Sequence, residues 1–181
     1  MKSERYIQKL IEFLSSQNYE IIDEMSEVLS QAWAKGANVW IAGNGGNAAN
    51  SLHFATDWSK GLFLKTGKSM KVRSLVDNIS LFSALTNDLA IEQVFSFQLS
   101  STAKPGDVCV LMSAGGSSEN IRLAADYCSR NEITTLGLLG GSKPTLTGLF
   151  TKELHIPTDD IQIVEDIHAA FGHIVFKYIN L

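Results

Sequence analysis

Two residues whose side chains can bind metal ions or transfer protons, His53 and Asp57, lie four positions apart in a segment with helical spacing. In a helix this spacing puts both side chains on one face, one turn apart. A histidine and a carboxylate in that arrangement can hold a divalent metal ion or share protons with a substrate. The same spacing is also that of an ordinary helix salt bridge, so the pair alone leaves both interpretations open.

A second group of such residues lies near the C-terminus, where Glu165, Asp166 and His168 precede His173. At 100° per residue, Asp166 lies about 20° from His173 around a helix and Glu165 about 80°. Either carboxylate can therefore act beside His173, and the periodicity does not choose between them. His168 lies about 140° from His173, which favours a buried structural histidine or one that reaches another subunit.

A serine-rich turn, residues 113–118 with the sequence SAGGSS, follows the apolar run VCVLM and precedes a helical pattern. Backbone N–H groups at a helix N-terminus favour an anion, and the hydroxyl groups add donors. No Walker lysine follows, so a nucleoside triphosphate is disfavoured and a phosphate monoester fits better. The simpler alternative is an N-cap serine without a ligand.

A glycine-rich loop, Gly43-Asn44-Gly45-Gly46-Asn47, follows another apolar run. Its glycines permit positive φ angles and close approach of a ligand to the backbone. The loop is not taken as a dinucleotide-binding fingerprint, because no acidic partner for a ribose is evident. A plain tight turn is the alternative.

Apolar spacing and turn residues predict the elements that position these side chains. Two helices are expected over residues 4–34, broken near residues 15–18, where the sequence is SSQN. Further helices are expected over 47–58, 78–86, 91–102, 117–131 and 161–178, and strands over 38–42, 71–76, 108–112, 133–139 and 153–156.

The alternation of strands and helices after residue 36 predicts an α/β fold with a parallel, doubly wound sheet and helices on both faces. We expect one domain over residues 1–181, with an N-terminal helical extension over 1–35 and the α/β core over 36–181. Ligands of such sheets bind beyond the carboxyl ends of the strands. The glycine loop and the serine turn are both expected there.

The composition excludes several classes of protein. The net charge of −4 gives no electrostatic basis for binding nucleic acid or an acidic membrane. Two cysteines, Cys109 and Cys128, are too few for a disulfide framework and are expected to be small buried apolar residues in a reducing compartment. The N-terminus lacks the apolar core of a signal peptide, and no run is long enough to span a bilayer, so we expect a soluble cytoplasmic protein.

The segments GNGGNAANSLHFATDW, TNDLA and SAGGSSEN, together with E-D-x-H-x4-H, resemble the SIS (sugar isomerase) superfamily and, within it, the phosphoheptose isomerases. The resemblance implies a flavodoxin-like five-stranded sheet and a homotetramer with active sites between subunits. It implies one zinc ion (Zn²⁺) per site and an aldose–ketose isomerisation through an enediol. The implied reaction converts sedoheptulose 7-phosphate to D-glycero-D-manno-heptose 7-phosphate, a heptose precursor of lipopolysaccharide or capsule.

Carried over by position, the resemblance gives three sets of residues. The metal ligands are His53, Asp57, Glu165 and His173, of which Asp57, Glu165 and His173 also serve catalysis. The residues implied to bind the phosphate group are Ser113, Ser117 and Ser118. The residues implied to contact the rest of the substrate are Asn44, Asn47 and Asp88.

The chain departs from the family pattern at both acidic positions, because Asp57 replaces Glu and Glu165 replaces Gln. One carboxylate is shortened and one amide becomes a carboxylate, which leaves two histidines and two carboxylates as zinc ligands. The general base is then Asp57 or Glu165. Smaller departures are Asn47 for Ser, Ala114 for Ser or Thr, and a missing arginine at Gly61, beside Lys60.

These residues lead us to expect an enzyme, because all four metal positions keep side chains that can bind a metal. An isomerase acting on a different sugar phosphate is one alternative. The other is a non-catalytic SIS-domain protein that binds sugar phosphates for regulation, whose mark would be the loss of those ligands.

Overall fold

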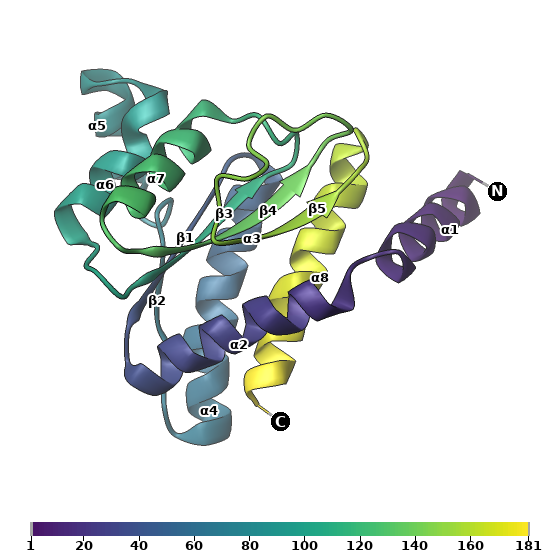
Figure 1. Cartoon of the computed structure of the whole chain (residues 1–181), viewed down its shortest axis with the longest axis horizontal. Coiled ribbons are helices and arrows are strands. Elements are labelled where there is room, and N and C mark those ends of the chain that lie inside the picture. The colour runs from purple at the N-terminus through teal and green to yellow at the C-terminus, as the bar shows by residue number, and fades with distance from the viewer. Residues whose placement is uncertain (1, 181) are drawn as a thin grey trace.

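A computed structural model describes residues 2–180 and contains a five-stranded parallel sheet between two layers of helices (Figure 1). The strand order is β2-β1-β3-β4-β5, which is the flavodoxin-like order. The predicted α/β class, strand number and parallel pairing are therefore confirmed. The strands are β1 (Asn38–Gly43), β2 (Lys71–Ser74), β3 (Val108–Ser113), β4 (Thr134–Gly140) and β5 (Lys152–Ile156).

The helices follow the predicted order, with differences in detail. The predicted helix over 47–58 continues through a π-helix, η1 (Asp57–Gly61), into a further short helix, and the one over 91–102 begins as a 3₁₀ turn, η2 (Ile91–Gln93). The predicted break near residues 15–18 separates the first two helices. The α-helices are α1 (Lys2–Ser15), α2 (Tyr19–Lys35), α3 (Gly46–Thr56), α4 (Leu62–Thr66), α5 (Ile79–Asp88), α6 (Val94–Thr102), α7 (Glu119–Arg130) and α8 (Ile161–Ile179).

The two faces of the sheet carry separate hydrophobic cores, because neighbouring residues of a strand point to opposite faces. Val39 and Ile41 of β1 belong to the core with α2, α3 and α8. Trp40 and Ala42 belong to the core with α5, α6 and α7. The near-continuous burial of β1, β3 and β4 agrees with the apolar runs from which these strands were predicted.

Helix α1 extends away from the sheet at the right of Figure 1 and is tied to α8 by polar contacts. The Tyr6 hydroxyl donates to Asp166 Oδ2 at 2.7 Å, and Lys9 pairs with Asp160 at 2.7 Å. No residue of α1 is buried in the described chain. The helical extension expected at the N-terminus is therefore present, with one carboxylate of α8, Asp166, turned toward it.

Two expectations from composition concern the cysteines and the membrane. Cys109 and Cys128 are both buried and neither is in a disulfide, as expected for small apolar residues. Within residues 2–180, no helix has the length and apolar character needed to cross a bilayer.

Asp107, just before β3, is a buried carboxylate that ties the amino ends of two strands together. It accepts hydrogen bonds from the backbone N–H of Asn38 and of Lys104 and from Trp40 Nε1, each at 3.0 Å. Burial by itself would raise the pKa of Asp107, but these hydrogen bonds outweigh it and the pKa is lowered. The pKa of Asp107 is lower in the folded protein than in the unfolded chain. The carboxylate therefore stabilises the folded state fully above about pH 4, and this stabilisation is lost as the pH falls through the folded pKa.

Replacement of Asp107 by alanine is expected to lower the free energy of unfolding by about 3 kcal/mol, because several buried donors lose a charged acceptor. Urea unfolding at pH 7 measures this, and the loss should shrink as the pH falls below about 4. Asp77→Ala is the matched control, because Asp77 forms an exposed pair with Arg73 and is expected to cost less than about 1 kcal/mol. Equal effects of the two substitutions would contradict the role of Asp107.

Candidate functional site

The glycine loop after β1 and the serine turn after β3 lie side by side, because these strands are neighbours in the sheet. Asn44 and Asn120 join the two segments through a reciprocal pair of amide hydrogen bonds of 2.9 and 3.0 Å. The sheet changes winding direction between β1 and β3, which is the position where ligands of this fold bind. The predicted meeting of the two loops at one strand edge is thus observed.

An open cleft of about 560 Å³ lies at this position. Asn44 and Gly45 line it from the glycine loop, and Ser118 and Asn120 line it from the start of α7. A third, largely apolar wall comes from the segment around α5 and η2. The complete lining is Gly43, Asn44, Gly45, Ala48, Val76, Ile79, Phe82, Ile91, Glu92, Ser118, Glu119 and Asn120.

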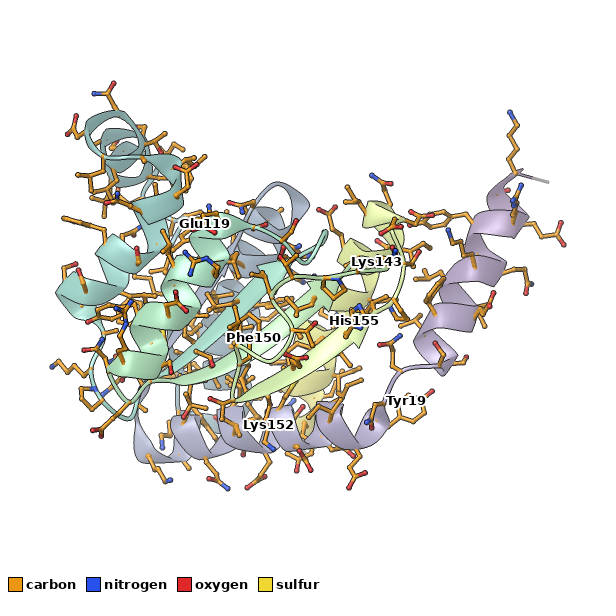
Figure 2. The ribbon with its side chains drawn as sticks, turned by 45° about the horizontal axis from the view of Figure 1, so that its top comes forward. Tyr19, Glu119, Lys143, Phe150, Lys152 and His155 are labelled. Carbon is orange, nitrogen blue, oxygen red and sulfur yellow. The ribbon has the colours of Figure 1, made fainter. Side chains whose placement is uncertain are left out.

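Two helices begin at the cleft without a side-chain cap. Helices α2, α5 and α8 start at Asn18, Asn78 and Asp160, whose side chains accept a backbone N–H of the first turn. In the described structure, the N-cap residues of α3 and α7, Gly45 and Ser118, make no such bond. Figure 2 shows Glu119 at the start of α7. In α3 the N–H groups of Asn47 and Ala48 already donate to the carbonyls of Asn44 and Gly45, both at 3.0 Å. The first turn of α7 is therefore the one best placed to receive an anion, the ligand that helix N-termini favour.

The three serines predicted to hold phosphate occupy different positions. Ser118 lines the cleft, and its hydroxyl lies 2.9 Å from the hydroxyl of the buried Ser113. Ser117 is exposed and lies outside the residues that line the cleft. Gly116 has a φ of +67°, and a side chain there would overlap Gly140 and Pro144, so the turn requires glycine. Ser118 is thus the serine best placed to meet a ligand, with Ser113 behind it.

His53, Asp57 and His173 converge at the junction of α3, η1 and α8. The Nε2 atoms of the two histidines are 2.8 Å apart, and Asp57 Oδ2 lies 3.5 Å from His53 Nε2 and 4.0 Å from His173 Nε2. Their side chains are 49, 33 and 55% exposed for His53, Asp57 and His173. Two imidazole nitrogens and a carboxylate oxygen within 4.8 Å of one another form a donor set that suits zinc.

Close packing of α8 on α3 brings these three residues together. Gly172 has no side chain, and an added Cβ would overlap the ring of Phe54. Trp58, the second residue of η1, is buried and donates from Nε1 to the carbonyl of Gly172 at 2.9 Å. The residue that follows Gly172 is His173, so this contact fixes how near His173 comes to His53.

Glu165, predicted as the fourth metal ligand, lies two turns of α8 before His173, about 12 Å along the helix axis. Its carboxylate packs against Gly46, in the first turn of α3, where an added Cβ would overlap it. The cluster with metal-binding geometry in the described chain consists of His53, Asp57 and His173. The structure therefore brings three of the four predicted ligands together, and the metal role of Glu165 stays a prediction.

The predicted substrate contacts also differ in their surroundings. Asn44 lines the cleft. Asn47 is only 1% exposed, and its Oδ1 lies 2.8 Å from Nδ1 of the buried His168. Asp88, the last residue of α5, is exposed, accepts a hydrogen bond from Asn87 and lies outside the lining of the cleft. The roles of Asn47 and Asp88 toward a substrate stay predictions.

Sequence reasoning missed two features of the cleft. One is Asn120, which stands in the segment SAGGSSEN, two residues after Ser118, and bonds Asn44. Its place in the first turn of the helix after a strand-end loop was the available signal. The other is the apolar wall, whose residues Val76, Ile79, Phe82 and Ile91 come from the chain between β2 and α6. Nothing in their spacing distinguishes them from core residues.

Comparison with known proteins gives concordant results. The family model for the SIS domain matches residues 4–140. The chain is 34% identical over 160 residues to the phosphoheptose isomerase of Clostridium acetobutylicum, covering 88% of this chain and 81% of that one. It is 29% identical over 180 residues to a probable phosphoheptose isomerase of Thermoplasma acidophilum, covering 99% and 98%.

Solved structures show the same fold. A phosphoheptose isomerase from Francisella tularensis superposes with a TM-score of 0.92 at 20% identity, covering 99% of this chain and 96% of that one. A phosphoheptose isomerase from Neisseria gonorrhoeae gives a TM-score of 0.90 at 20% identity, covering 99% and 97%. The likeness extends over the whole sheet and the N-terminal helices.

Proposed function

Because the chain belongs to the SIS domain family and, within it, to the phosphoheptose isomerases, we propose a specific reaction for it. The protein converts sedoheptulose 7-phosphate to D-glycero-D-manno-heptose 7-phosphate with the help of zinc. Membership of this family makes the protein a sugar-phosphate isomerase. The observation that most supports the zinc-assisted reaction is the convergence of His53, Asp57 and His173 on one point.

The phosphate end of the sugar is assigned to the strand-edge cleft. Ser118 and the uncapped first turn of α7 offer neutral O–H and N–H donors to a phosphate. Among the described lining residues none is a lysine or arginine, so these donors and the two helix dipoles carry the recognition. Ser113, hydrogen-bonded to Ser118, orients that hydroxyl.

Replacement of Ser118 by alanine is expected to raise KM for the sugar phosphate about 10- to 100-fold, because a hydrogen bond to a charged group contributes about 1.5–3 kcal/mol. The effect on kcat is expected to be smaller, since the phosphate is remote from the reacting carbons. Steady-state kinetics measure both constants. Ser100→Ala is the control, because Ser100 is an exposed serine of α6 that bonds its own helix. An unchanged KM in Ser118→Ala would place the phosphate elsewhere.

The reactive end of the sugar is assigned to the metal cluster. Isomerisation moves a proton between the two carbons and another between their oxygens. Zinc bound by His53, Asp57 and His173 would polarise the carbonyl and the neighbouring hydroxyl. Asp57 is the carboxylate at the cluster and is assigned the carbon proton, while His173 is assigned the oxygen proton. Glu165 is the alternative base; Asp166 is less suited, because it accepts a hydrogen bond from Tyr6 of α1.

We also propose a homo-oligomer, in the form of a tetramer, in which another subunit covers the open side of the cluster. The supporting observation is the exposure of large apolar side chains on the neighbouring helix α4, where Phe63 is 55% and Leu64 69% exposed. Residues of this kind are common at interfaces between subunits. A covered site would also keep bulk water away from the reacting carbons.

The test is an isomerase assay on the full chain with sedoheptulose 7-phosphate, before and after removal of metal by a chelator. We expect turnover that falls at least about 100-fold on chelation and returns with zinc, because the metal stabilises charge in the transition state. Molar mass measured on the same sample tests the tetramer. Turnover of a different ketose phosphate would redirect the substrate assignment. An absence of turnover with zinc, together with no phosphate-ester binding by calorimetry, would contradict the proposal.

A further inference from the structure

His168 is a polar residue of α8 that the proposed reaction does not use, yet it lies in the core between α8 and α3. Its side chain is fully buried. Its Nδ1 lies 2.8 Å from Asn47 Oδ1, the oxygen of a residue in the first turn of α3. We propose that His168 is a positioning residue, which holds Asn47 and thereby fixes the glycine loop and the first turn of α3 where they receive the phosphate group.

The hydrogen bond defines the state of the ring. Asn47 Oδ1 also faces the amide nitrogen of Asn50 at 3.5 Å, so the atom turned to His168 is an acceptor. With the amide oxygen turned to the ring, we assign the proton to Nδ1 of His168, which leaves Nε2 as an acceptor. Desolvation by burial lowers the pKa of His168 to about 3, so the ring stays neutral at physiological pH.

The second ring nitrogen indicates that stability alone does not explain this histidine. Nε2 of His168 is buried and has no hydrogen-bond partner among the described residues. A buried acceptor without a donor costs about 1–3 kcal/mol. The ring thus contributes one hydrogen bond to Asn47 and carries a penalty at its other end. A leucine of similar size would avoid that penalty, so the contact with Asn47 is the property that the histidine supplies.

Asn47 is the link between this contact and the phosphate. It follows Gly45 and Gly46, and its backbone N–H donates to Asn44 O at 3.0 Å, which closes the loop. A side chain at Gly43 would overlap Asn47, so the loop is packed against it. Asn44 and Gly45 line the cleft. A shift of Asn47 therefore moves both the lining of the cleft and the start of α3.

The test compares His168→Leu, which keeps the volume but removes the donor, with His168→Asn, whose amide can replace Nδ1–H. The inference uses the phosphate site of the proposed function, so binding of inorganic phosphate is measured as well as KM and kcat for sedoheptulose 7-phosphate. For His168→Leu we expect KM and the phosphate Kd to rise about tenfold, which is about 1.4 kcal/mol, and kcat to change less than about threefold. The free energy of unfolding should stay near that of the wild type, because one unpaired acceptor replaces another.

His168→Asn is expected to bind phosphate within about threefold of the wild type, since it restores the donor to Asn47. Zinc content should be unchanged in both variants, because His53, Asp57 and His173 remain. Ser26→Ala is the matched control: Ser26 is also fully buried but lies on α2, where it bonds the carbonyl of Ile22, and its loss should leave the phosphate Kd unaltered.

Nitrogen-15 NMR of the wild-type protein tests the tautomer without any substitution. We expect a neutral Nδ1–H ring for His168 that does not titrate between pH 5 and 8. An Nε2–H tautomer, or a folded His168→Leu with unchanged KM and phosphate Kd, would overturn the inference. If His168→Leu does not fold, the test passes to His168→Asn. A folded His168→Asn that binds phosphate much more weakly than the wild type would also overturn the inference. If His168→Leu binds phosphate more weakly and the wild type shows no isomerase turnover, the positioning role of His168 is supported and the proposed function is contradicted.

Discussion

Replacing His173 by alanine is expected to remove zinc from the purified protein and to lower kcat/KM about 1,000-fold, or about 4 kcal/mol of transition-state stabilisation. His173 Nε2 lies 2.8 Å from His53 Nε2 and 4.0 Å from Asp57 Oδ2, so its loss leaves only two ligands in the cluster. The residue is also assigned the oxygen proton of the reaction. One substitution therefore removes a metal ligand and a proton-transfer group together.

The fold should survive this change, because the His173 side chain is 55% exposed. The melting temperature in zinc-free buffer is therefore expected to match the wild type, and bound zinc is measured by elemental analysis after dialysis. Glu165→Gln is the informative companion, because the Glu165 carboxylate packs against Gly46 rather than in the cluster. We expect it to retain zinc. A His173→Ala protein with full zinc and full activity would show that the cluster is an ordinary group of surface residues.

The fold was predictable to a large extent because its signals are local. The runs at β1, β3 and β4 are apolar without alternation, as strands buried on both faces must be. Their alternation with helical patterns then leaves few topologies. The π-helix η1 was not predictable, because the apolar spacing of Trp58 and Leu62 fits a regular α-helix equally well. A π-turn depends on one extra residue per turn, which tertiary packing accommodates and local propensity does not encode.

The candidate site was predictable in its residue types and less so in its grouping. Helical periodicity pairs His53 with Asp57 from their four-residue spacing, and the structure retains that pair. The eight-residue spacing of Glu165 and His173 also implies a rise of about 12 Å along a helix, but it does not show that the Glu165 carboxylate packs against Gly46 of α3. The burial of Asn47 was likewise hidden, since it follows from the contact between α3 and α8. Contacts between elements far apart in the sequence decide these points, and a single sequence does not show them.

Gly172 lies where α8 packs against α3, next to His173 of the metal cluster. Two physical effects of Gly172→Ala change the free energy of unfolding in opposite directions. In an isolated helix, alanine in place of glycine stabilises by about 1 kcal/mol. In this protein the added Cβ would overlap the ring of Phe54, which is fully buried and stacks on Trp58 at a centroid distance of 5.2 Å. Overpacking of a close-packed core costs about 1–3 kcal/mol. We therefore expect a net loss of about 1 kcal/mol, measured by urea unfolding without zinc.

The same substitution is expected to weaken zinc binding about tenfold, because α8 must move away from α3 to admit the methyl group and takes His173 with it. A shift of a few tenths of an ångström alters the 2.8 Å approach of the two histidine nitrogens. Zinc titration with a competing chelator measures the affinity. Phe54→Leu in the Gly172→Ala background frees space at the contact, so the double variant should recover part of both losses and give a favourable coupling energy. Additive losses, or a Gly172→Ala protein more stable than the wild type, would mean that helix propensity rather than the α3–α8 contact governs this position.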